Sequence, residues 1–118
     1  MKRIVLLLTI SIFFFALSSA YAHPPSDIKI TFDLKTKMLK AVIMHNTSNP
    51  ATHYIKKVDV GLNGEEVIEH TISREDNNEA QTVSYLIPDA MAGDSISLEG
   101  YCSISGKLMK EIKVGAEK

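Results

Sequence analysis

The feature that most constrains this chain is a strict alternation of apolar and polar residues along short segments. In residues 27–33 the apolar side chains of Ile28, Ile30 and Phe32 share one face, and polar or charged side chains occupy the other. A period of two residues is typical of a half-buried β-strand. No segment keeps the 3.6-residue apolar period of an amphipathic helix. The alternation therefore predicts an all-β domain.

Similar patterns predict strands at residues 27–33, 38–44, 54–62, 65–73, 82–87 and 95–103, and a closing strand near 108–114. In the third of these, Tyr54, Val58, Val60 and Leu62 are expected to share one face. Asn63-Gly64 indicates a tight hairpin, because a type I′ turn needs positive φ at both central residues. Six or seven short strands at this spacing favour an antiparallel β-sandwich of immunoglobulin-like type.

Residues 1–22 have the pattern of a secretory signal peptide. Lys2 and Arg3 precede an apolar run, and Ala20 and Ala22 form the small-residue pattern that a signal peptidase cleaves. The run is shorter than the ~20 residues of a spanning helix, so an uncleaved anchor is the less favoured alternative, and no cysteine follows the run for a lipid anchor. We therefore expect cleavage before His23, export to a compartment such as the periplasm, no membrane attachment afterwards, and one domain at residues 23–118.

Charge and cysteine content narrow the function classes. The signal segment holds two of the thirteen basic residues and no acidic ones, which leaves eleven basic against fourteen acidic residues and a net charge of −3. This balance argues against a nucleic-acid partner. The single cysteine, Cys102, cannot form an internal disulfide. It is therefore a buried thiol, a link to another chain, a reactive group or a metal ligand.

Three of the four histidines, together with Cys102, form a candidate metal site. His45 and His53 bracket a polar, Pro-containing loop between two predicted strands, and His23 lies at the expected start of the mature chain. Cys102 closes a later strand, and strand ends of a sandwich share a rim. Imidazole with thiolate suits zinc, copper and iron, and does not suit magnesium or calcium.

The order of these motifs resembles the iron domain of the superoxide reductases (desulfoferrodoxin and neelaredoxin). The matching features are His45, a short loop and His53-Tyr54-Ile55, followed by the Asn63-Gly64 hairpin. The segment Glu99-Gly100-Tyr101-Cys102-Ser103-Ile104-Ser105-Gly106 is similar to the closing Tyr-Cys-Asn-x-His-Gly motif of that family. His23-Pro24-Pro25 stands where the family has its first ligand histidine. The resemblance covers nearly all of residues 23–118.

The resemblance implies an immunoglobulin-like sandwich that binds one iron ion and reduces superoxide to peroxide with electrons from an unidentified donor. In that family four histidines lie in a plane around the iron, with an axial cysteine thiolate and an open sixth position. By matching position, His23, His45 and His53 would be planar ligands and Cys102 the axial one.

The chain departs from the family pattern at three places. Ser105 stands where the family has its last ligand histidine. The glutamate and lysine that precede the family's first ligand histidine have no counterpart, since Ala22 precedes His23. The loop between His45 and His53 is slightly longer. The fourth histidine, His70, lies in a segment that the family does not use for ligation. We interpret it as structural, with replacement of the missing ligand as the alternative.

Two other functions stay open. One is a periplasmic copper or zinc binding module that uses His23, His45, His53 and Cys102, in which the free amine and imidazole of His23 could chelate copper together. The other is a metal-free sandwich that binds another protein through its sheet edges or loops. The sequence leaves the redox partner, another small ligand and a homo-oligomeric state undecided.

Overall fold

The computed structural model describes residues 23–115 and consists of strands without helices. The strands are β1 (Asp27–Asp33), β2 (Met38–Met44), β3 (Ile55–Leu62), β4 (Glu65–Thr71), β5 (Ala80–Leu86), β6 (Ser95–Cys102) and β7 (Lys107–Lys113). The expected signal peptide at residues 1–22 lies outside the described residues. Within residues 23–115 there is no helix long and apolar enough to cross a membrane.

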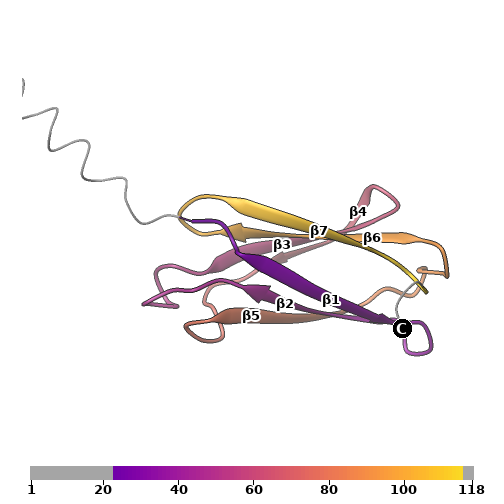
Figure 1. Ribbon diagram of the computed structural model, residues 1–118, viewed down its shortest axis with the longest axis horizontal. Helices are drawn as coiled ribbons and strands as arrows, with labels where there is room; N and C mark the ends of the chain where they lie inside the picture. The colour runs from indigo at the N-terminus through magenta and orange to yellow at the C-terminus, as the bar shows by residue number, and fades with distance from the viewer. Residues whose placement is uncertain (1–22, 116–118) are drawn as a thin grey trace, which may run out of the picture.

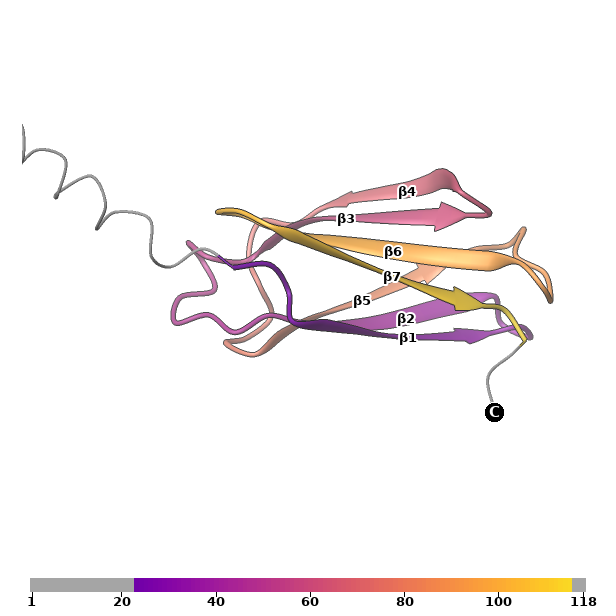
Figure 2. The ribbon, with the colours of Figure 1, turned by 45° about the horizontal axis from the view of Figure 1, so that its top comes forward.

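The seven strands form two antiparallel sheets that face each other (Figures 1 and 2). One sheet has the order β1-β2-β5 and the other β4-β3-β6-β7. The predicted all-β, immunoglobulin-like sandwich is thereby confirmed. In the constant-type immunoglobulin order the fourth strand would lie beside the fifth. Here β4 pairs with β3 instead, because the Asn63-Gly64 hairpin folds it directly back; both residues have positive φ.

The core lies between the sheets and comes from the inward positions of the alternating strands. Buried residues alternate along β2 and β6, as expected for strands with one face towards the core. The fully buried side chains of the two sheets include Leu39, Ile43, Ile55, Val58, Val60, Ile96 and Leu98. Burying a side chain of this size stabilises the fold by about 1.5–3 kcal/mol, so this layer is the main source of stability.

The inward face of β3 differs from the prediction at its start. Tyr54 was expected to share the buried face with Val58, but Tyr54 is half-buried and Ile55 is fully buried. The register between β3 and β6 shifts between Ile55 and Lys57, so Ile55 and Val58 both face the core. An irregularity of this kind inserts one residue and breaks strict alternation, which a period-two pattern cannot anticipate.

One end of the sandwich gathers the segments that carry the candidate ligands. β2 ends at Met44, β3 begins at Ile55, and β6 ends at Cys102, which pairs with Ile55. The described chain also begins at this end, and the backbone N–H of Ser26 donates to the carbonyl of Met44 at 2.8 Å. We call this end the ligand rim.

Candidate metal centre

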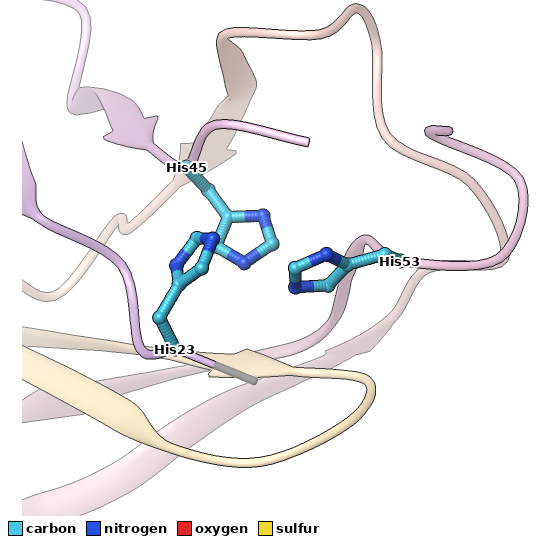
Figure 3. A group of neighbouring side chains, drawn as sticks. All are labelled: His23, His45 and His53. Carbon is cyan, nitrogen blue, oxygen red and sulfur yellow. The ribbon is translucent and has the colours of Figure 1, made fainter. Parts of the chain in front are cut away.

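Three histidine side chains meet at the ligand rim. The ring centroids of His23 and His45 are 4.8 Å apart, those of His23 and His53 5.0 Å, and those of His45 and His53 4.7 Å. One ring nitrogen from each residue lies within 4.8 Å of the other two. Figure 3 shows the three rings facing a common centre from separate segments. The predicted convergence of His23, His45 and His53 is therefore present in the fold.

His45 is placed by the alternation of β2. The inward residues of this strand are Leu39, Ala41 and Ile43, so the next position of the same phase, just past the strand end, is His45. Its backbone N–H donates to the carbonyl of Glu79 at 2.9 Å, which keeps the chain extended for one more step. The side chain consequently enters the core end of the sandwich, and the residue is 1% exposed.

His53 is placed by a tight turn inside the loop between β2 and β3. The carbonyl of Asn49 accepts the backbone N–H of His53 at 2.9 Å, and the Asn49 side chain accepts the N–H of Ala51 at 3.1 Å. Such local bonds from asparagine stabilise a turn at this point. The turn brings His53 back towards His45 before β3 begins.

His23 is placed by the turn between β6 and β7. Gly106 has φ of +92°, and a Cβ there would lie 2.8 Å from the backbone nitrogen of Pro24. Only glycine permits so close an approach. Pro25 is buried beside Gly100, and the segment continues into β1 (Figure 2). His23 itself is exposed and closes the cluster from outside.

A fourth residue, Glu75, supports the cluster and was not anticipated. Its carboxylate Oε1 lies 2.6 Å from Nδ1 of His45, and both side chains are buried. Residues 74–79 are rich in charged residues and asparagine, as is typical of an exposed loop, yet Glu75 is only 1% exposed. No local pattern marks it, because its neighbours are polar and its partner is thirty positions away. A carboxylate on the outer nitrogen of a ligand histidine is a recurring feature of metal sites.

Burial governs the proton equilibria of the cluster. It lowers the pKa of His45 and of His53, and the neighbouring imidazoles lower both further. It also raises the pKa of Glu75 to about 7, with smaller opposing effects from the Ile55 backbone and His23. The lowered pKa values of buried His45 and half-buried His53 favour the neutral imidazole, the form in which histidine binds metals. A cation near His45 would favour the ionised form of Glu75.

Two ring nitrogens are left without a hydrogen-bond partner inside the protein. Nε2 of His45 and Nε2 of His53 are both buried and unpaired. Buried polar atoms nearly always have a partner, so each unpaired one needs an explanation. With Nδ1 of His45 directed at Glu75, its Nε2 is available as a lone-pair donor. A metal ion at the centre of the cluster would satisfy both atoms.

Cys102 lies at the same end but outside the three-histidine group. It is 2% exposed and continues the inward phase of β6 beyond Gly100. A Cβ on Gly100 would lie 3.3 Å from the Ile43 side chain. Two residues after Gly100 on β6 comes Cys102, and two residues after Ile43 on β2 comes His45. Cys102 and His45 therefore belong to the next layer of inward side chains, closer to the ligand rim. Within residues 23–115, the possible ligand atoms at this site that all lie within 4.8 Å of one another belong to His23, His45 and His53, and the Cys102 sulfur is not among them.

The other two polar residues considered from the sequence lie elsewhere. Ser105 is exposed in the β6–β7 turn, next to Gly106. His70 is exposed on β4, where its Nδ1 lies 2.8 Å from the hydroxyl of Tyr85 on β5. This contact joins the edge strands of the two sheets, which agrees with a structural role.

A second group of metal-capable side chains was not expected from the sequence. Asp59, Glu66 and Glu69 approach one another on β3 and β4. The charge of Asp59 raises the pKa of Glu66, and Lys57 lies 3.4 Å from Asp59. Repulsion among these carboxylates is thus partly offset by a lysine of the same sheet.

Comparison with known proteins neither supports nor contradicts the resemblance to the superoxide reductases. Family models, curated proteins and solved structures contain no match to this chain.

Proposed function

We propose that this protein is an exported mononuclear metal protein with a superoxide reductase-like iron site. The proposed ligands are His23, His45, His53 and Cys102, and the proposed substrate is superoxide. The observation that carries the proposal is the meeting of three imidazoles from three separate segments, two of them with buried unpaired nitrogens. Export itself is proposed from the signal-like pattern of residues 1–22.

The donor set fits the proposed ion. Neutral imidazoles suit iron, copper and zinc, and a nearby thiolate adds a soft ligand that magnesium and calcium would not use. Bound iron would supply the single electron that converts superoxide, with two protons, to hydrogen peroxide, and an external donor would restore that electron. Glu75 would hold the ring of His45 in orientation and keep the proton on Nδ1.

The surface next to Cys102 favours an anionic small ligand. Lys56 and Lys107 line a depression of about 340 Å³ together with Tyr101, Cys102 and Ser105. Two cations at a concave surface raise the local concentration of small anions. These lysines come from β3 and β7 and lie on the Cys102 side, opposite the open position that the resemblance implies, so their charge would act on the approach of an anion to this end of the sandwich.

Anaerobic titration with Fe(II) tests the proposal. We expect one iron per chain and, after oxidation, a thiolate-to-iron absorption band that Cys102→Ser removes. His45→Ala should abolish tight binding, whereas the matched variant His70→Ala should leave it unchanged, because His70 lies outside the cluster. Equal iron binding by both variants would contradict the site. Absence of iron binding in the unmodified protein would favour the metal-free interaction domain.

A zinc or copper binding module is the second candidate, and one observation favours it. The group that meets within 4.8 Å contains imidazoles only, with the thiol outside it. Three histidines with an open position form a common zinc arrangement. Competition among Fe(II), Zn(II) and Cu(I) for the purified protein separates the two functions. If the protein retains zinc or copper and excludes iron, the zinc or copper binding module is the function that the result supports.

A further inference from the structure

We propose that hydrolysis of the Ala22–His23 bond turns the backbone nitrogen of His23 into a further ligand of the three-histidine cluster, so that export completes the metal site. This inference rests on the proposed function and deepens it, because it makes loading of the site conditional on removal of the leader. It requires His23 to be fixed at the rim, a nitrogen able to coordinate, and a cleavage position at this residue.

The chain on the C-terminal side of His23 is fixed against the sandwich. Pro24 packs on Gly106, where a Cβ would come within 2.8–3.0 Å of its atoms, and Pro25 is buried. The N–H of Ser26 donates to Met44 at 2.8 Å. The His23 ring already lies 4.8 Å and 5.0 Å from its two partner rings, measured between centroids. The ring of His23 is therefore held at the cluster, and its backbone nitrogen is joined to that ring through Cα and Cβ.

The coordinating ability of that nitrogen depends on cleavage. In the intact chain it belongs to an amide, whose lone pair is delocalised into the carbonyl of Ala22. Hydrolysis by a signal peptidase adds one water across this bond and leaves a carboxylate on Ala22 and an amine on His23. The amine has a free lone pair. Nδ1 of His23 lies 3.0 Å from the carbonyl oxygen of Pro24. Once it gives up this contact, Nδ1 can close a six-membered chelate ring with the amine through Cα, Cβ and Cγ of the same residue.

The residues on either side of His23 favour its amine as the backbone nitrogen that coordinates the metal. Pro24 has no backbone N–H, so the next backbone nitrogen cannot be deprotonated to become a competing ligand. The Ala20-x-Ala22 pattern places cleavage immediately before His23. Cleavage one residue earlier or later would leave no histidine amine at all. Three imidazoles and one amine form a set of four nitrogens, which suits the tetragonal coordination of Cu(II).

The experiment uses Cu(II) as the probe, because its electron paramagnetic resonance spectrum counts bound nitrogens. The exported protein is first analysed by mass spectrometry, and an N-terminal His23 is expected. It is then compared with the same chain carrying Gly-Ser-Gly-Ser before His23, which displaces the amine. The matched control carries Gly-Ser-Gly-Ser after Lys118. The N-terminal extension should weaken Cu(II) binding by about tenfold or more and remove one nitrogen from the spectrum. The C-terminal extension should change neither.

The outcomes separate this inference from the proposed function. Equal Cu(II) affinity and equal nitrogen count in the two extended proteins would overturn the amine ligand. So would a mature N-terminus at another residue. If His45→Ala still abolishes binding in that case, the three-histidine site stands without the amine. If His45→Ala has no effect in any of these proteins, the proposed metal site fails as well.

Discussion

At the scale of single residues, the Glu75 carboxylate determines what His45 can do. Glutamate is rarely buried unless it is paired, and here the pair is formed with an imidazole inside the protein. The contact fixes the His45 ring, and the other ring nitrogen, Nε2, is buried without a hydrogen-bond partner. A buried carboxylate that raises ligand basicity accounts for this otherwise costly arrangement.

Replacing Glu75 by Gln should weaken metal binding while the fold persists. The amide keeps a hydrogen-bond acceptor but loses the negative charge that offsets a bound cation. Loss of such a partner typically lowers metal affinity about 10–100-fold. Zn(II) competition titration measures the change. Glu79→Gln is the control, because this residue lies in the same loop with an exposed side chain. Equal affinities for the two variants would show that the Glu75 charge plays no part.

At the scale of elements, the ligands stand where regular strands stop. His45 follows β2, His53 precedes β3, and His23 depends on the turn between β6 and β7. A residue at a strand end can turn its side chain towards the ligand rim without breaking the backbone hydrogen bonds that join neighbouring strands. The β6–β7 turn is the least obvious of these elements, because it contributes no ligand and acts through contact with Pro24.

Gly106→Ala should damage the metal site more than the fold. A residue other than glycine at φ of +92° costs about 1–2 kcal/mol. Its Cβ would also meet the Pro24 backbone at 2.8 Å and displace the segment that carries His23. We expect weaker metal binding in calorimetric titration, in addition to a lower free energy of unfolding in urea.

Gly93→Ala is the matched control for this prediction. Gly93 has the same φ of +92°, but a Cβ there has no atom within 4 Å. It should therefore lose a similar free energy of unfolding and bind metal as the unmodified protein does. Equal loss of metal affinity in both variants would show that backbone strain, and not the contact with Pro24, is responsible.

At the scale of the whole molecule, the metal site joins parts of the chain that only folding brings together. Its ligands belong to the N-terminal segment, the β2 end and the β3 start, and Glu75 comes from the loop before β5. A metal ion held by the folded chain and not by the unfolded chain stabilises the fold by mass action. Metal binding and global stability are therefore linked.

Zinc should raise the thermal midpoint, and a chelator should reverse the rise. Free Zn(II) at a hundred times its Kd would add about 2.7 kcal/mol. For a domain of this size each kcal/mol corresponds to roughly 4–8 °C. Differential scanning calorimetry with and without EDTA measures the shift. The shift should disappear in His45→Ala and persist in His70→Ala. A shift of the same size in both would place the bound ion elsewhere, for example at Asp59, Glu66 and Glu69.

The sequence alone determined the fold class and most strand positions, because period-two alternation and the Asn63-Gly64 turn are local properties of the chain. It also identified His23, His45, His53 and Cys102 as candidates, from the ends of predicted strands, the expected start of the mature chain and the order of motifs in the resembling family. Only the tertiary structure decided that these rings meet, that Cys102 lies outside their group, and that Glu75 is buried beneath His45. The physical reason is that these relations depend on packing between distant segments. The bulge at the start of β3 and the contact of Gly106 with Pro24 are of this kind, and no local periodicity records them.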